Sequence, residues 1–472
     1  MRRRVCRGAC VLGLAAAPLL PLAGGADDSE RTGGDTTVYV TGYNAFSMPA
    51  ATLDESGRTR FAIGNSFFRR NWVEAPSSTA ARDGLGPRFI ARSCGGCHQQ
   101  GGRGAPPALD GGRNRDQPVA LLLRLSIPGT DAHGGPLPEP GYGDQFRIAA
   151  VRGVPADGRI DIAYREAAGR YADGQPYSLR APTYRFEALA YGTMDERAMT
   201  SPRIAPQLIG MGLLEAIAES DILDNAKRQA ARTDAVHGVA NRVWDAFAER
   251  HTIGRFGWKA NVGSLAHQTA GAFQADIGIT SRRFPEQPCT PTQTACRAAP
   301  AGGHGGGPEI DDRTLADVIY NQSVLAPPAR RNAGDPAVKR GEALFASAEC
   351  GVCHRPSYVT AEVADSRYGS AVLGRQKIFP YTDLLLHDMG AGLADGRPDF
   401  AADGRQWKTP PLWGLGLIPD VNGHSYLLHD GRARGVLEAI LWHGGEAQAS
   451  KQRVVNMNEE ERGCLVKFVE SL

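Results

Sequence analysis

Two short motifs have the residue types and spacing for covalent attachment of a prosthetic group. Both read Cys-x-x-Cys-His, and their reactive residues are Cys94, Cys97 and His98 in the first motif and Cys350, Cys353 and His354 in the second. Two thiols three residues apart can form thioethers with the two vinyl groups of one haem. The histidine that follows can give an imidazole nitrogen to the iron. The sequence therefore predicts two covalently bound haem c groups.

Two other chemistries also use paired cysteines. A zinc site could be built from two Cys-x-x-Cys pairs, and a redox-active dithiol needs only one pair. Zinc would not require a histidine directly after each second cysteine. A thioredoxin-like dithiol would require neither the histidine nor the duplication, so haem attachment is favoured.

The sixth coordination position of each iron decides what a c-type haem does. Closure by His and Met gives an electron carrier of high potential, whereas an open position can bind peroxide or another small oxidant. Candidates for the distal ligand of the C-terminal haem are Met389 and His424. A lone Met is usually core filling, and His424 could hold a loop, so neither is preferred. For the N-terminal haem, His133 in a glycine-rich loop is a candidate, and an open site is the alternative.

Cleavage of peroxide also needs a group that gives and takes protons beside the open iron. Glu215 is an acid inside the apolar run at 212–217. Burial would raise its pKa and suit it to this role, which makes it the candidate catalytic acid. The alternative is that Glu215 points to solvent from an amphipathic helix.

The first 26 residues have the order of an export signal. Arginines at 2–4 precede a short apolar stretch at 11–22, and small residues precede Asp27. We expect a signal peptide at 1–26 that is cleaved near Ala26, and a periplasmic protein with no membrane span in the mature chain. An uncleaved anchor is the alternative.

One pair of the other cysteines agrees with a protein outside the cytoplasm. Cys289 and Cys296 flank a short loop and are expected to form a disulfide in an oxidising compartment. Cys464 lies on an apolar helix face and is expected to be a buried thiol. The formal net charge is +2, with Lys and Arg spread along the chain, so no nucleic-acid partner is expected.

A chain of 472 residues is too long for one compact core. The proline-rich stretch at 326–335 predicts a boundary between an N-terminal cytochrome c-like haem domain at 27–334 and a C-terminal one at 335–472. The fold class is expected to be mainly α. The first domain should carry a large loop-rich insertion with short strands.

Capping residues and periodicity predict individual elements. Asp335 and Pro336 begin a helix that leads into the second motif, and Asn458 caps a closing helix with acidic residues in its first turn. Phe89 and Phe345 each precede a motif by five positions, which predicts an inward Phe on a helix before each motif. The other predicted elements are helices at 206–230, at 235–250 and up to Tyr320, and a strand at 160–164.

With these motifs, the sequence resembles the di-haem oxidoreductase family, whose members are often labelled peroxidases or thiol oxidoreductases. It is distantly similar to di-haem bacterial cytochrome c peroxidases, and the resemblance covers nearly all of the mature chain. Its marks are Gly64-Asn65-Ser66-Phe67-Phe68, Asn71-Trp72-Val73-Glu74-Ala75-Pro76, Gly84-Leu85-Gly86-Pro87, Tyr142-Gly143-Asp144-Gln145, Phe256-Gly257-Trp258-Lys259-Ala260, Thr409-Pro410-Pro411-Leu412-Trp413, His429-Asp430-Gly431-Arg432-Ala433 and Trp442-His443-Gly444-Gly445-Glu446-Ala447.

The resemblance implies a two-haem reaction. A high-potential C-terminal haem would take electrons from a small periplasmic donor of the cytochrome c or cupredoxin type, and a lower-potential N-terminal haem would reduce peroxide or a related small oxidant. The alternative function is a non-enzymatic di-haem electron-transfer cytochrome.

The chain also departs from the peroxidases. In them a distal Met stands just before a His-x-Gly turn, and residues 409–412 and 429–431 match that frame. Here Ser425 stands in the place of the methionine, which raises His424 as a substitute with Met389 as its rival. The distal histidine that follows the first motif of the peroxidases has no clear match.

Overall fold

The computed structural model describes residues 28–79, 81–303 and 307–472. Helices make up 30% of the structure and strands 19%. The expectation of a mainly α fold is therefore right about the dominant element and understates the strands. The predicted signal peptide at 1–26 lies outside the described residues.

One helix pair combines a helix that precedes the first motif with a helix that lies far after it in sequence. Helix α1 (Glu55–Arg69) is capped by Asp54, and helix α7 (Asp312–Ser323) is capped by Asp311, in each case by a carboxylate that accepts first-turn N–H groups. The two helices cross at Gly64, where a Cβ atom would lie 2.0 Å from the carbonyl oxygen of Asp317. Only glycine allows this close approach.

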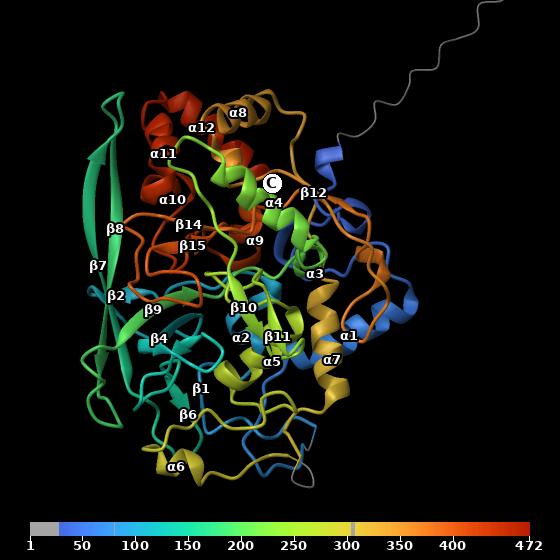
Figure 1. Ribbon diagram of the computed structural model, residues 1–472, viewed down its shortest axis with the longest axis vertical. Coiled ribbons are helices and arrows are strands. Elements are labelled where there is room, and N and C mark those ends of the chain that lie inside the picture. The colour runs from blue at the N-terminus through green and yellow to red at the C-terminus, as the bar shows by residue number, and fades with distance from the viewer. Residues whose placement is uncertain (1–27, 80, 304–306) are drawn as a thin grey trace, which may run out of the picture.

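A second helix pair has the same construction in the C-terminal part. Helix α8 (Pro336–Ser347) begins at the predicted cap Asp335, and helix α12 (Glu459–Ser471) begins at the predicted cap Asn458, which forms a capping box with Glu461. Both predictions are confirmed. The helices cross at Gly341, where a Cβ atom would lie 2.0 Å from the carbonyl oxygen of Cys464. In Figure 1 this pair lies at the top and α1–α7 at the lower right.

The internal repeat is real but involves a different phenylalanine from the one predicted. Phe89 lies on the two-residue strand β1 (Arg88–Phe89), so no helix carries it into the first motif. The counterpart of Phe345 is Phe68 of α1, because each lies four residues after the glycine of its helix crossing. The predicted repeat failed because it assumed equal spacing to the motif, whereas a loop separates α1 from the first motif.

Strands are concentrated in the insertion that follows the first motif. β7 (Arg159–Arg170) and β8 (Pro176–Glu187) form a long antiparallel hairpin along one side of the molecule, at the left of Figure 1. The predicted strand at 160–164 lies within β7. A three-stranded antiparallel sheet has the order β5 (Pro136–Leu137), β4 (Leu121–Thr130) and β9 (Met199–Ile204).

Two predicted helices differ in the structure. The run at 206–230 is divided into α3 (Met211–Glu215) and α4 (Glu219–Ala230), because the backbone of Ala218 is extended. The helix predicted at 235–250 is wrong: this segment contains β10 (Arg242–Asp245), which pairs with β11 (Arg250–Ile253). Asp245 accepts turn N–H groups through its side chain, which favours a turn over a helix at this point.

The remaining elements are short. The helices are α2 (Cys94–Cys97), α5 (Leu265–Ala272), α6 (Thr294–Arg297), α9 (Ile418–Asn422), α10 (Val436–Trp442) and α11 (Gln448–Val455), with a π-helical turn at Phe273–Ile277. The strands form antiparallel pairs, namely β1 with β6 (Ala149–Ala150), β2 (Leu109–Asp110) with β3 (Arg113–Asn114), β12 (Tyr358–Val359) with β13 (Lys377–Ile378), and β14 (Leu386–Asp388) with β15 (Gln406–Lys408).

The principal hydrophobic core draws on both sides of the predicted domain boundary. Phe46, Phe273, Phe345 and Phe468 all belong to it. A division at 334/335 therefore cuts through a shared core, and the two domains stay a prediction. The predicted Cys289–Cys296 disulfide is confirmed, and Cys464 is buried as a free thiol. Among the described residues, no helix has the length and apolarity to cross a bilayer.

The close crossing of α8 and α12 leads to a prediction about Gly341. Replacing Gly341 with Ala should lower the free energy of unfolding by about 1–3 kcal/mol, because the new methyl group forces the helices apart. Gly463 of α12 is the matched control, since a Cβ atom there has no neighbour within 4 Å. Gly463→Ala should raise stability by up to about 1 kcal/mol. Urea unfolding measures both, and equal effects would contradict the close crossing.

Candidate functional site

The second Cys-x-x-Cys-His motif opens onto a cavity of about 560 Å³. Cys350, Cys353 and His354 all line it, together with apolar side chains from α3, α8, α10 and α12. A volume of this size with mostly apolar walls suits a large organic ligand. The motif therefore faces the space that a prosthetic group would need.

The two thiols of this motif are positioned by a short turn after α8. Glu349 adopts a left-handed conformation, and a 3₁₀ turn (Cys350–Val352) follows it. Both cysteines are free. Burial raises the pKa of Cys350 to about 12 and also raises that of Cys353, so both sulfurs are neutral thiols at neutral pH.

The histidine of this motif is held in one orientation. Its Nδ1 lies 3.0 Å from the carbonyl oxygen of Tyr381, so Nδ1 carries the proton and donates it. This tautomer leaves the Nε2 lone pair for a ligand in the cavity. Burial lowers the pKa of His354 to about 4, which keeps the ring neutral. A neutral imidazole whose other nitrogen is fixed by a carbonyl is the usual form of a metal-binding histidine.

The first motif has the same local geometry. The nitrogen Nδ1 of His98 lies 2.7 Å from the carbonyl oxygen of Pro206, and burial lowers the pKa of the ring. Cys94 and Cys97 are free, and burial raises the pKa of Cys94 to about 12. Each motif therefore presents two neutral thiols and one neutral, oriented imidazole.

An equivalent phenylalanine packs beside each motif histidine. The ring centroids of Phe68 and His98 are 6.5 Å apart, and those of Phe345 and His354 are 6.3 Å apart. Because Phe68 and Phe345 come from the two glycine-crossed helix pairs, each pair supports one motif. Pro206 also lines the cavity, so the segment that orients His98 forms part of the wall around the second motif.

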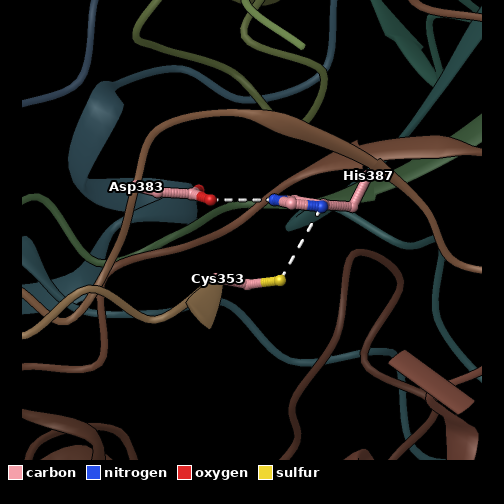
Figure 2. A group of neighbouring side chains, drawn as sticks. All are labelled: Cys353, Asp383 and His387. Atoms are coloured by element: carbon pink, nitrogen blue, oxygen red, sulfur yellow. Dashed lines mark hydrogen bonds and ion pairs between the residues drawn. The ribbon is translucent and has the colours of Figure 1, made fainter. Parts of the chain in front are cut away.

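A cluster beside Cys353 has the composition of a metal site but the bonding of an ion pair (Figure 2). Ligand atoms of Cys353, Asp383 and His387 lie within 4.8 Å of one another. His387 Nε2 is 2.9 Å from Asp383 Oδ2, and its Nδ1 is 2.7 Å from Glu446 Oε2. Both ring nitrogens therefore face carboxylate oxygens.

The charge of His387 follows from these contacts. Burial by itself would lower its pKa, but Asp383 and the other groups around the ring raise it well above the ordinary value. With both nitrogens protonated, the ring has no lone pair for a metal ion. The bonding therefore argues against zinc at this cluster.

Cationic side chains lie in the wall of the cavity. Lys408 is 8% exposed and lines the cavity, and burial lowers its pKa to about 8. Arg103 and Arg255 also line it. The Nη1 of Arg255 donates to the carbonyl oxygens of Leu214 and Ile217. Cations in an apolar cavity suit a ligand that carries carboxylates.

A c-type haem meets each of these features. Its vinyl groups match the paired thiols, its iron matches the Nε2 of His354, and its two carboxylates match the cations at the wall. The residues that surround the second motif therefore fit the group that the motif predicts.

The structure separates the predicted distal candidates. Met389 lines the cavity, whereas His424 is not among the described residues that do so. Both ring nitrogens of His424 meet the backbone: Nε2 lies 3.0 Å from the carbonyl oxygen of Arg103, and Nδ1 accepts from the N–H of Tyr426. His133 is exposed and stacks on Trp244, with ring centroids 4.0 Å apart.

Glu215 is half-buried and hydrogen-bonded. Its Oε1 accepts from the backbone N–H of Leu265 at 2.8 Å, at the first residue of α5. Burial raises the pKa of this carboxyl, and the bond from Leu265 and the charge of Arg255 oppose the rise. The described residues that line the cavity include Arg255, whose charge acts on Glu215, but not Glu215 itself. The catalytic role of Glu215 stays a prediction.

Besides His387, two further histidines of the cavity were not singled out from the sequence. His429 stacks on Trp407, with ring centroids 3.8 Å apart, and His443 follows α10. Both lie in stretches that mark the family resemblance, Trp442-His443-Gly444-Gly445 and His429-Asp430-Gly431. That resemblance was the only signal that could have pointed to them.

The comparisons with known proteins agree with this geometry. Residues 27–472 match the sequence model of the family described as "Di-haem oxidoreductase, putative peroxidase". No curated protein and no solved structure matches the chain.

The ion-pair cluster gives a prediction about stability. His387→Leu should lower the free energy of unfolding by about 3–5 kcal/mol, because it leaves the buried Asp383 and the half-buried Glu446 without their shared cation. The matched control is His237→Leu at an exposed histidine, where a change within about 0.5 kcal/mol is expected. Urea unfolding at neutral pH measures both. A similarly small change at both positions would mean that His387 carries no charge.

Proposed function

This chain belongs to the di-haem oxidoreductase family, and from that premise we propose that it is a periplasmic oxidoreductase with two covalently attached c-type haems. The observation that carries the proposal is the cavity lined by Cys350, Cys353 and His354, whose walls fit a haem. The family supports two haem groups and an oxidoreductase activity.

The C-terminal haem would be held by thioethers from Cys350 and Cys353. Each thioether forms when a thiol adds across a vinyl group, so the neutral, free state of both sulfurs is the required starting state. His354 would supply an axial ligand through Nε2, which the bond from Nδ1 to Tyr381 leaves available.

The N-terminal haem would be held in the same way by Cys94 and Cys97, with His98 as the axial ligand. The bond between Nδ1 of His98 and the carbonyl of Pro206 supports this assignment, because it matches the bond made by His354. Two motifs with equal geometry support two attachment sites of the same kind.

The reaction we propose is the reduction of peroxide. One hydrogen peroxide takes two electrons and two protons and gives two waters, so two molecules of a one-electron donor are consumed. The donor is a small periplasmic cytochrome c or cupredoxin, and electrons pass from the C-terminal to the N-terminal haem. Kinship supports this direction. Glu215 is the proposed proton donor, supported by its raised pKa.

The periplasmic location rests on the export signal expected at 1–26. The Cys289–Cys296 disulfide supports it, because disulfides persist in oxidising compartments. A non-enzymatic electron carrier is the alternative function. In that case each iron would need a second ligand that leaves no open coordination position.

Counting haems in cysteine variants tests the attachment sites. A pyridine haemochrome assay should find two haems per chain in the wild type. It should find one in Cys350→Ala/Cys353→Ala and one in Cys94→Ala/Cys97→Ala, because each double variant removes both thioethers of one motif. Cys464→Ala, which removes a buried free thiol, should keep two. Colourless wild-type protein after normal export would refute the proposal.

Electron paramagnetic resonance of the half-reduced protein tests the reaction. After one electron has been added to each molecule, a high-spin ferric signal from an open N-terminal iron should remain. Hydrogen peroxide should then be consumed at one molecule for every two donor molecules oxidised. Two low-spin irons without peroxide turnover would instead establish the electron carrier.

A further inference from the structure

His443 directly follows α10, and its ring is held by a hydrogen bond. Its backbone N–H donates to the carbonyl of Ile440 at 3.0 Å, and its Nδ1 lies 2.7 Å from the carbonyl oxygen of Ala439. A carbonyl only accepts, so Nδ1 carries the proton and Nε2 carries the lone pair. The side chain lines the same cavity as Cys350, Cys353 and His354.

His443 makes the same kind of hydrogen bond as the two motif histidines. His98, His354 and His443 each give the Nδ1 proton to a backbone carbonyl, at distances of 2.7, 3.0 and 2.7 Å.

Other histidines near the C-terminal motif lack this combination. His387 directs both nitrogens at carboxylates, and His424 directs both at the backbone. His429 lies flat against the ring of Trp407, and its Nε2 is 3.8 Å from Asp430 Oδ2. The 3.8 Å contact is too long for a hydrogen bond, so it does not fix which nitrogen of His429 carries the proton, whereas the bond from Nδ1 does so for His443.

Met389 is the remaining rival, because it too lines the cavity. Its loop packs against the loop that follows His443: a Cβ atom at Gly444 would lie 3.0 Å from the carbonyl oxygen of Met389. A ligand from either loop would therefore reach the cavity from the same region. Of the two side chains, only His443 is pre-oriented by a hydrogen bond.

We propose that the Nε2 of His443 is the second axial ligand of the C-terminal haem iron, opposite His354. This inference rests on the proposed function, since it requires a haem at the second motif. It replaces the two candidates that the sequence left open, Met389 and His424, and gives the iron His/His ligation. Two imidazoles give a low-spin iron with a lower reduction potential than His/Met ligation, and they close this iron to peroxide. A small oxidant would then bind at the N-terminal iron.

Three variants of the full-length exported protein test the ligand. His443→Gly removes the imidazole, His443→Met replaces it with a thioether, and Met389→Leu removes the rival sulfur at similar side-chain volume. Haem content is measured first in every variant by pyridine haemochrome. The spectral signals of the C-terminal iron are those that are absent from the Cys350→Ala/Cys353→Ala variant, which lacks the second attachment site.

The expected result is specific to His443. His443→Gly should lose the low-spin ferric signal of the C-terminal iron and gain a high-spin one, and added imidazole should restore the low-spin signal. His443→Met should shift the near-infrared charge-transfer band from the His/His to the His/Met form and raise the potential. Met389→Leu should leave both readouts unchanged.

Other outcomes overturn the assignment. If Met389→Leu loses the low-spin signal while His443→Gly keeps it, the ligand is Met389. If His443→Gly matures poorly, an unchanged band and potential in His443→Met refute the proposal. Wild-type protein without a haem at the second motif would refute the proposed function itself, and the haem count separates that failure from a wrong ligand.

Discussion

Both candidate haem sites depend on the hydrogen bond from a motif histidine to a distant backbone carbonyl. The bond determines which nitrogen keeps its lone pair, and it therefore decides whether the imidazole can act as a ligand at all. Neither acceptor belongs to its motif. Pro206 follows His98 by 108 residues, and Tyr381 follows His354 by 27. The rest of the fold positions these two carbonyl groups.

Aromatic packing holds one of these carbonyls. Tyr381 has a positive φ of 53°, which is uncommon for a residue with a side chain. Its ring packs against Phe345 and Phe468, at centroid distances of 5.9 and 5.8 Å. These phenylalanines belong to α8 and α12, the helices that cross at Gly341. The crossing, the aromatic cluster and the orientation of His354 are therefore parts of one packing arrangement.

The sequence predicted those features that depend on neighbouring residues. The attachment motifs and the caps at Asp335 and Asn458 were visible because spacing and residue type determine them locally. The helix predicted at 235–250 failed because turn bonds made by Asp245 compete with helix formation. His443 was missed as a ligand candidate because its role depends on a cavity assembled from distant segments, and the bond that orients it is visible only in the structure.

The separation of each histidine from its acceptor has a consequence for the chain entropy lost in folding. The N-terminal loop, from His98 to Pro206, is four times as long as the C-terminal loop, from His354 to Tyr381. Two doublings of loop length add about 1.2 kcal/mol of closure entropy. The long loop also contains the β7–β8 hairpin and strand β4. Bringing the acceptor to His354 therefore costs less chain entropy than bringing the acceptor to His98.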